Sequence, residues 1–252
     1  MQIAKPVDWI SETKFVVDGL EFSGDLASYA EKTTLDRVVI LKEARLLRQY
    51  LDLLAPHSTN NILELGIWQG GSPLFYGLAT DARKIVALDI ASPLPVLDEI
   101  IARHGLRDKV KLHFGMSQDD REAVSALIDD EFGDTPIDLV IDDASHYYEH
   151  SRKSFEIVFP HVRPGGFYII EDWQWAHIDS PDYQTGGHFV GKPALTNLIF
   201  ELLIAYGGTP SLFANIIVRD WFVAIQKGGR TVDSDFRLDD LLRMRGKKLT
   251  LI

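Results

Sequence analysis

The stretch of sequence that decides the fold is Asn61-Ile-Leu-Glu-Leu-Gly-Ile-Trp-Gln-Gly-Gly-Ser72. It starts with a short apolar run and continues through three glycines into a stretch with helical character. Glycines let the backbone turn sharply and approach a ligand closely, and Ser72 is suited to cap the helix that follows. The stretch therefore predicts a strand, a glycine-rich turn and a helix.

The alternation of short apolar runs and helical stretches continues downstream, which is the pattern of a parallel sheet with helices on its faces. We expect helices over residues 72–80, 94–104, 119–131, 149–160 and 194–206, and strands at Asn61–Leu65, Lys84–Asp89, Val110–Phe114, Ile137–Ile141 and Gly166–Ile170. Two final apolar runs, Ala214–Val218 and Trp221–Gln226, lie so close in sequence that they must be antiparallel if they pair. The predicted fold class is α/β: a doubly wound, mainly parallel, seven-stranded sheet with one antiparallel strand in its edge region.

Apolar residues at helical spacing between Thr33 and Leu54 predict an N-terminal helical cap over residues 1–57, followed by a main domain over residues 58–252. After Asp172, a long aromatic segment over residues 173–193 has the character of a substrate lid. Its aromatic side chains either form an apolar wall for a substrate or pack the lid onto the core: Trp173, Trp175 and Tyr183.

Composition excludes several classes of function. The 252 residues include 37 acidic and 26 basic side chains, a net charge of −11, which argues against a nucleic-acid partner. No cysteine is present, so thiolate catalysis and zinc-thiolate sites are excluded. The N-terminus lacks the pattern of a signal peptide and no apolar run is long enough to cross a bilayer, so we expect a cytoplasmic protein without a membrane partner.

The glycine-rich loop is a candidate cofactor site. Its spacing is Gly-x3-Gly-Gly, which argues against a dinucleotide, and Glu64 would repel a pyrophosphate but suits a cofactor with cationic groups. Asp89 ends the second predicted strand, where a carboxylate can accept hydrogen bonds from ribose hydroxyls. These features suggest S-adenosylmethionine, although such turns also occur without any ligand. The predicted cofactor-binding residues are Glu64, Gly66, Gly70, Gly71, Ser72, Asp89, Ser117, Gln118 and Asp142.

Two acidic pairs follow neighbouring predicted strands: Asp142-Asp143, with His146 close behind, and Glu171-Asp172. The carboxyl ends of parallel strands meet at one edge of a sheet. Three carboxylates, those of Asp143, Glu171 and Asp172, suit a hard cation such as Mg²⁺, and His146 would act as the general base. The alternative is that the acidic pairs are solvated or cap helices, and that His146 is a structural histidine.

The combination Glu-x-Gly-x3-Gly-Gly-Ser, an acidic end of the second strand, Asp-Asp-x-Ser-His and Gly-Gly-x4-Glu-Asp resembles the metal-dependent O-methyltransferases that act on sugars of macrolides and related antibiotics, with rhamnosyl O-methyltransferases and the cephalosporin methoxylation protein in the same group. The resemblance runs from about Asn61 to Asp172. It implies a Rossmann-like class I methyltransferase fold. It also implies magnesium ligands at Asp143, Glu171 and Asp172, a general base at His146, and S-adenosylmethionine contacts in the glycine loop, at Asp89 and near Asp142.

The resemblance implies methyl transfer to a hydroxyl of a deoxysugar, whether free, nucleotide-linked or part of a glycosylated natural product. Trp68 replaces the usual middle glycine, and Trp173-Gln-Trp175 follows the Glu-Asp pair, which puts the substrate in doubt more than the reaction. A catechol-type O-methyltransferase and a non-catalytic cofactor-binding partner protein remain alternatives. The cap also suggests a homo-oligomer.

Overall fold

The structure is a computed structural model that describes residues 1–24 and 29–248. The chain forms two compact units, Met1–Met116 and Ser117–Ile252. The expected division between residues 1–57 and 58–252 falls inside the first unit and stays a prediction.

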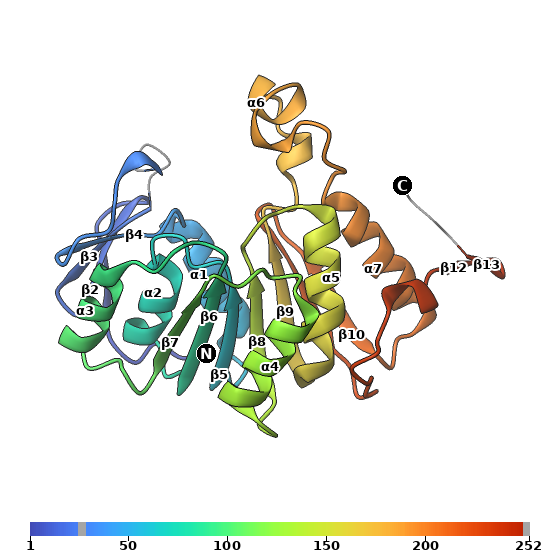
Figure 1. Ribbon diagram of the computed structural model, residues 1–252, viewed down its shortest axis with the longest axis horizontal. Coiled ribbons are helices and arrows are strands. Elements are labelled where there is room, and N and C mark those ends of the chain that lie inside the picture. The colour runs from blue at the N-terminus through green and yellow to red at the C-terminus, as the bar shows by residue number, and fades with distance from the viewer. Residues whose placement is uncertain (25–28, 249–252) are drawn as a thin grey trace. The chain divides into compact units, whose positions relative to one another are not determined.

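Three parallel strands form the centre of the first unit, in the order β5 (Asn61–Leu65), β6 (Lys84–Asp89) and β7 (Val110–Phe114). Helix α2 (Gly71–Ala79) connects β5 to β6, and α3 (Pro95–Arg103) connects β6 to β7 (Figure 1). All residues of α2 are buried, as expected for a helix that is apolar all round. The three strands have the predicted bounds, and the two helices begin and end within one residue of the prediction.

The N-terminal residues differ from the prediction of a helical cap. They form a small four-stranded sheet, and the helix α1 starts only at Ala44. Along β2 and β3, buried and partly exposed side chains alternate with the period of a strand, and Asp18 and Gly19 adopt positive φ angles of 51° and 80° in the tight turn between them. The cap is therefore mixed α/β: β1 (Val7–Trp9), β2 (Lys14–Val17), β3 (Leu20–Ser23), β4 (Arg37–Val39) and α1 (Ala44–Leu54).

Aromatic rings join the small sheet to α2 within the first unit. Phe15 of β2 and Phe22 of β3 stack at 5.1 Å between ring centroids. Phe75 of α2 meets Phe15 edge-on at 5.5 Å. All three side chains are fully buried, so the small sheet and the helix after the glycine loop share one core.

The second unit contributes four strands, in the order β10 (Phe213–Val218), β11 (Phe222–Lys227), β9 (Val162–Glu171) and β8 (Ile137–Asp142). β8 and β9 are parallel, whereas β11 is antiparallel to both of its neighbours. With β5, β6 and β7 they make up a mixed sheet of seven strands, which confirms the predicted fold class. The last two strands pair in the antiparallel direction that their short separation in sequence requires.

Three longer helices accompany these strands: α4 (Arg121–Phe132), α5 (Tyr148–Val158) and α7 (Thr196–Gly208). Strand β9 begins earlier than predicted, at Val162 rather than Gly166. Its pairing with β8 shifts between Ile137 and Leu139, and this irregularity accommodates Pro164 and the two glycines after it within the strand.

The aromatic segment after β9 contains only short helical turns, η3 (Trp175–His177), α6 (Pro181–Gln184) and η4 (Gly187–Phe189). In Figure 1, α6 stands well away from β8 and β9. The remaining short elements of the unit are η2 (Phe159–His161), η5 (Leu238–Asp240), β12 (Arg243–Met244) and β13 (Lys247–Lys248).

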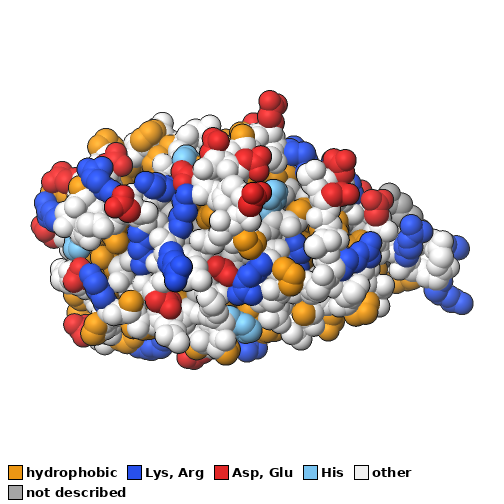
Figure 2. Space-filling model, turned by 90° about the horizontal axis from the view of Figure 1, so that it is seen from below, with side chains coloured by type: hydrophobic (Ala, Val, Ile, Leu, Met, Phe, Trp, Pro, Cys, Tyr) orange, Lys and Arg blue, Asp and Glu red, His pale blue; other side chains and the backbone are white. Residues whose placement is uncertain are grey.

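On the face shown in Figure 2, acidic and basic side chains are interspersed. Within the described residues, no helix combines the length and the apolar character that a bilayer crossing requires.

Candidate functional site

The acidic pairs follow the ends of two adjacent parallel strands. Asp142, the last residue of β8, is opposite Ile170 of β9, so Asp143 and Glu171 come next on their strands. The backbone then turns: Asp172 has a φ of 53°, and its N–H donates a 2.8 Å hydrogen bond to the carbonyl of Trp221. The register of β8 and β9 therefore brings the two acidic pairs to one edge, as their sequence positions predict.

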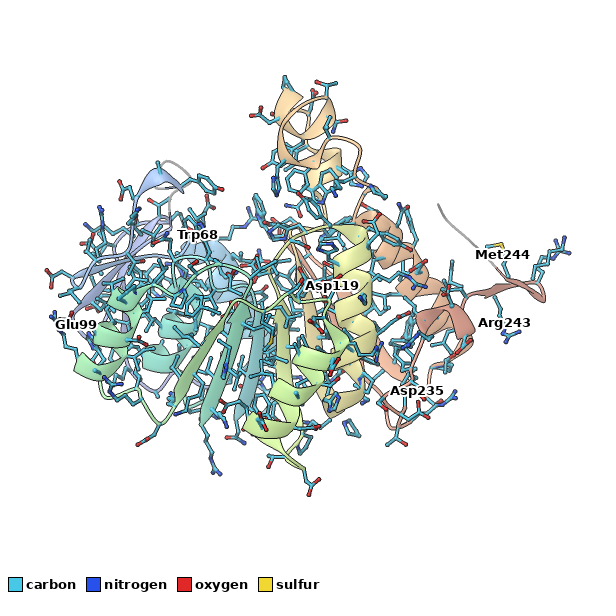
Figure 3. The ribbon with its side chains drawn as sticks, viewed as in Figure 1. Trp68, Glu99, Asp119, Asp235, Arg243 and Met244 are labelled. Carbon is cyan, nitrogen blue, oxygen red and sulfur yellow. The ribbon has the colours of Figure 1, made fainter. Side chains whose placement is uncertain are left out.

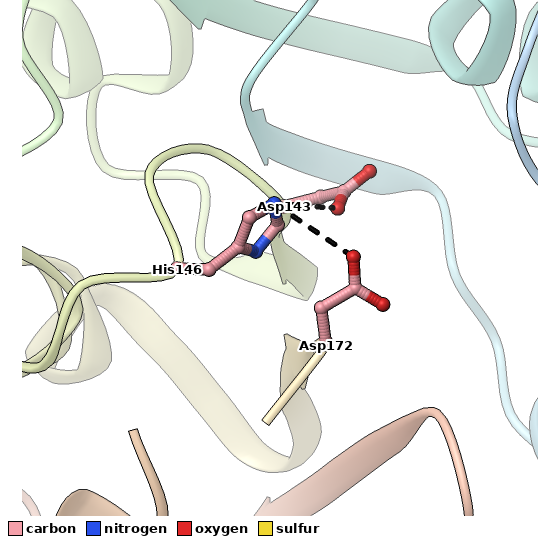
Figure 4. Close-up of side chains that lie close together, drawn as sticks. All are labelled: Asp143, His146 and Asp172. Carbon is pink, nitrogen blue, oxygen red and sulfur yellow. Dashed lines mark ion pairs between the residues drawn. The ribbon is translucent and has the colours of Figure 1, made fainter. Parts of the chain in front are cut away.

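Asp143, His146 and Asp172 converge at this edge (Figure 4). One potential ligand atom from each lies within 4.8 Å of the others. Nε2 of His146 is 3.9 Å from Asp143 Oδ1 and 3.8 Å from Asp172 Oδ2, both longer than a hydrogen bond. The three side chains are partly exposed, at 24%, 21% and 41% in the same order, so an ion and a substrate could reach them.

The cluster contains two of the three predicted metal ligands, Asp143 and Asp172, and its third member is the predicted base, His146. Glu171 ends β9 directly before Asp172, is only 2% exposed, and is not one of the residues in the cluster. Glu171 is the last residue of β9, whereas Asp172 lies in the turn that follows, so the alternation of side chains along the strand does not fix how the two carboxylates lie relative to each other.

Asp142 lies inside a buried hydrogen-bond network. Its Oδ1 accepts a 3.0 Å hydrogen bond from Nε2 of Gln118, and its Oδ2 accepts one of 3.0 Å from the Tyr168 hydroxyl. Burial raises the pKa of Asp142 to about 6, and the hydrogen bond from Tyr168 opposes this effect. Asp142 was predicted on the cofactor side, and both of its oxygens have protein partners here.

Ser117 and Gln118, predicted beside the adenine, also have protein partners. The Ser117 hydroxyl donates a 2.6 Å hydrogen bond to Oδ1 of Asp119, labelled in Figure 3, and this bond lowers the pKa of Asp119. Gln118 is 5% exposed, and its Oε1 accepts a 2.9 Å hydrogen bond from the backbone N–H of Ser145.

In the first unit, Asp89 holds the glycine loop. Its Oδ2 accepts hydrogen bonds from the backbone N–H groups of Ile67 and Trp68, and its Oδ1 accepts one from Ala91, all at 2.8 Å. A carboxylate offers about four lone-pair sites, so three amides leave room for about one further donor. Asp89 therefore keeps room for about one ribose hydroxyl, whereas the sequence suggested hydrogen bonds from both hydroxyls of a ribose.

The glycine loop is close-packed against the end of β4, at Gly71, and against α3, at Gly70. A Cβ atom at Gly71 would lie 2.3 Å from Cα of Ile40, and one at Gly70 would lie 2.5 Å from the Leu97 side chain. Gly66 has a φ of 103°. Trp68, labelled in Figure 3, adopts a left-handed φ of 45°, the conformation a glycine would take at no steric cost.

Ser72 does not cap the helix, contrary to the prediction. Helix α2 begins at Gly71, its N-cap residue is Gly70, and no side chain caps it. A cap residue must precede the first helical residue, and Ser72 lies within the first turn. Glu64 is fully buried in β5, opposite Ala87 of β6.

Tyr168 was missed as a contributor to the site, whereas Trp175 was predicted either to line a substrate wall or to pack the lid onto the core. The run Phe167-Tyr168-Ile169-Ile170 is typical of a buried strand, and the one hydroxyl in it required a partner that only the fold could identify. Nε1 of Trp175 donates a 2.9 Å hydrogen bond to the carbonyl of His146, and its ring stacks on Phe189 at 4.2 Å. Trp175 is 4% exposed, so it packs the aromatic segment onto the site loop.

Residues 63–173 match a family described as a methyltransferase domain. Two curated proteins are similar over parts of the chain. Demethylmacrocin O-methyltransferase of Streptomyces fradiae is 68% identical over 25% of this chain and 15% of its own length. Mycinamicin VI 2''-O-methyltransferase of Micromonospora griseorubida is 37% identical over 46% of this chain and 28% of its own length.

Among solved structures, the MycE methyltransferase from the mycinamycin biosynthetic pathway, in complex with Mg, SAH and mycinamycin VI, superposes with a TM-score of 0.52 at 25% identity. The match covers 72% of this chain and 49% of that protein, so the chain spans about half of it. The fold is that of the class I methyltransferases, as the motifs predicted. Residues 63–173 are therefore similar to a methyltransferase domain, and parts of the chain are similar to O-methyltransferases named for demethylmacrocin and mycinamicin VI.

Proposed function

We propose that this chain is a magnesium-dependent O-methyltransferase that transfers the methyl group of S-adenosylmethionine to a hydroxyl of a deoxysugar, free, nucleotide-linked or part of a glycosylated natural product. The observation that carries the proposal is the convergence of Asp143, His146 and Asp172 at the ends of β8 and β9. The similarity to sugar-modifying O-methyltransferases, among them an L-olivosyl-oleandolide 3-O-methyltransferase, supports the substrate class.

The residues at the acidic edge fit a magnesium ion. The carboxylates of Asp143 and Asp172 are hard oxygen donors, which Mg²⁺ prefers. Glu171, directly before Asp172, stays the proposed third ligand. Magnesium prefers oxygen to imidazole nitrogen, so His146 is left for proton transfer. Partial exposure leaves room for water or substrate oxygens to complete the coordination.

The loop after β5 fits S-adenosylmethionine. Its glycines permit close approach of a ligand, no basic side chain is present from Glu64 to Ser72 to attract a phosphate, and Asp89 keeps capacity for a ribose hydroxyl. The predicted contacts of Glu64, Gly66, Gly70, Gly71 and Ser72 belong to this proposal. Ser117, Gln118 and Asp142 are proposed to border the cofactor through the backbone, since their side chains bond to protein groups.

When bound, S-adenosylmethionine supplies an electrophilic methyl group, and Mg²⁺ supplies positive charge that makes a coordinated hydroxyl more acidic. His146 would take the proton from the acceptor hydroxyl, and the oxygen so activated would accept the methyl group as it leaves the sulfonium sulfur. Asp143 and Asp172 would hold the ion that orients the acceptor hydroxyl, so a large part of the rate would come from orientation.

The direct test is methyl transfer from labelled S-adenosylmethionine to a panel of deoxysugar glycosides, nucleotide sugars and catechols, with Mg²⁺ and with a chelator. We expect transfer to a deoxysugar hydroxyl that stops in the chelator and returns with added Mg²⁺. Asp143→Asn should reduce the rate at least ~10²-fold, a typical cost of losing a positioned catalytic group.

Full activity in the chelator would remove the metal from the proposal. Methyl transfer to catechols alone would contradict the deoxysugar substrate and would indicate a catechol-type O-methyltransferase. Cofactor binding without transfer to any acceptor would favour a non-catalytic partner protein.

Self-association and a cytoplasmic location remain predictions. The cap exposes Ile3 at 44% and Ile10 at 59%, and exposed apolar side chains of this size are compatible with a homo-oligomer. Sedimentation velocity over a range of protein concentrations measures the oligomeric state directly.

A further inference from the structure

The loop that carries Asp143 and His146 is bordered by a buried polar network that is not part of the cluster itself. We propose that Gln118, Asp142 and Tyr168 are positioning residues that fix this loop so that Asp143 and His146 face Asp172. In the test below, the measurements of metal affinity and methyl transfer rest on the proposed function, whereas the measurement of hydrogen exchange in the loop does not.

The network is closed to solvent. Gln118 is 5% exposed, Asp142 2%, and Tyr168 and Ser154 0%. In such surroundings each polar atom needs a partner, and an unmade hydrogen bond costs more than a made one contributes. The donors and acceptors match: Asp142 accepts from Gln118 and Tyr168, and Nε2 of Gln118 also donates to Ser154 Oγ at 2.7 Å.

Gln118 holds the loop on both sides of Asp143. Its amide nitrogen donates to the side chain of Asp142, one residue before Asp143, and its amide oxygen accepts from the backbone N–H of Ser145, two residues after. A single side chain therefore fixes the start and the end of the turn from which Asp143 projects.

The network ties the turn to two regular elements. Tyr168 belongs to β9, the strand that leads to Asp172, and Ser154 belongs to α5, where its hydroxyl donates to the carbonyl of His150 at 2.7 Å. These hydrogen bonds therefore connect the turn to β9, the strand that leads to the opposing carboxylate, Asp172.

The backbone of His146 needs such support. Its φ of 56° is left-handed, which costs a non-glycine residue free energy and persists only where the surroundings enforce it. Removing one bond of the network should therefore relax the turn before it unfolds the unit.

Tyr168→Phe removes only the hydroxyl, and Gln118→Met removes the amide at similar length. The matched control is Tyr148→Phe, because the Tyr148 hydroxyl donates an equally buried 2.8 Å hydrogen bond to the carboxylate of Glu201, which is not in the network. Tyr168→Phe and Tyr148→Phe each remove one buried hydrogen bond and should lose comparable stability. The discriminating measurements are amide hydrogen exchange over residues 143–147, Mn²⁺ affinity by calorimetry, and methyl-transfer kinetics.

We expect Tyr168→Phe and Gln118→Met to speed exchange in the turn at least about tenfold and to weaken Mn²⁺ binding about tenfold, the lower end of the range for groups that orient metal ligands. In Tyr168→Phe the kcat should fall while the KM for S-adenosylmethionine stays unchanged. Tyr148→Phe should change none of these.

Equal exchange and equal Mn²⁺ affinity in Tyr168→Phe and Tyr148→Phe would overturn the positioning role. If the unmodified protein transfers no methyl group, the proposed function fails and the exchange comparison still decides the inference. If the unmodified protein binds no Mn²⁺, the proposed metal site and the proposed function are both contradicted, and the comparison of hydrogen exchange still tests the positioning role.

Discussion

At the scale of single residues, Trp68, His146 and Asp172 share a left-handed backbone although none is a glycine. For an L-residue with a side chain this conformation costs about 1–2 kcal/mol. Local bonds offset that cost: the N–H of Trp68 donates to Asp89, and the N–H of Asp172 donates to the Trp221 carbonyl. Strain concentrated at these positions is typical of sites that must hold a fixed geometry.

His146→Ala tests the general base. If His146 removes the substrate proton, the variant should keep its affinity for S-adenosylmethionine and lose about 10²–10⁴-fold in kcat, the usual contribution of a positioned acid or base. Calorimetry with the cofactor and single-turnover methyl transfer measure the two quantities. Turnover at the unmodified rate would assign His146 a structural role instead.

The convergence of Asp143, His146 and Asp172 could be predicted because the ends of neighbouring parallel strands meet. The direction in which each side chain points at those strand ends could not be predicted from the sequence. Asp142 is the last residue of its strand and turns inward to Tyr168, while Asp143 turns outward, and the one-residue difference depends on where β8 stops. The position of Glu171 depends on the same detail at the end of β9.

At the scale of elements, the strands and helices from Asn61 to Phe132 could be read from the sequence because each is long enough to show its period. The N-terminal sheet could not, since its strands have only three or four residues. Val38 and Val39 fit the spacing of a helix with Leu35 as well as a short strand, and only pairing with β3 decides between them.

Two glycine-to-alanine substitutions should change the free energy of unfolding in opposite directions, because Gly71 packs against the end of β4 and Gly207 has open space beside it. Gly71→Ala places a Cβ 2.3 Å from Cα of Ile40 and 2.6 Å from the carbonyl oxygen of Val39, so the strand or the helix must shift. We expect a loss of about 1–3 kcal/mol in the free energy of unfolding, the usual cost of overpacking.

Gly207→Ala, in α7, is the control because no atom lies within 4 Å of its added Cβ. It should stabilise the protein by about 0.4–1 kcal/mol, because alanine lowers the conformational entropy of the unfolded chain. Urea unfolding of both variants measures the difference, and a Gly71→Ala variant as stable as Gly207→Ala would show that β4 does not press on the loop.

At the scale of the whole molecule, the family match begins at residue 63 and ends at residue 173. The small N-terminal sheet and the aromatic segment therefore lie largely outside the part that matches the methyltransferase domain. Loops and additions around a common fold usually carry substrate choice. The acceptor is accordingly the part of the function that the shared motifs define least.

Lys227 links the stability of the whole protein to pH. It is 2% exposed, and its Nζ donates to the carbonyls of Phe159 at 3.0 Å and Pro160 at 2.7 Å. Burial lowers the pKa of Lys227 from 10.5 to about 8. The ammonium form therefore persists at neutral pH, where folding carries the full cost of burying the charge.

Because the pKa is lowered in the folded state, the unfolded chain binds the proton more tightly between pH 8 and 10.5. The contribution of Lys227 to stability is constant below about pH 8 and rises as the pH increases to 10.5. Lys227→Met lacks this titration. The unfolding free energy of the unmodified protein, minus that of the variant, should rise by up to ~3 kcal/mol across this window, because a tenfold change in proton affinity corresponds to about 1.4 kcal/mol. Urea unfolding of both proteins along a pH series measures it, and a difference that stays flat or falls would show that the two carbonyls fully compensate the burial.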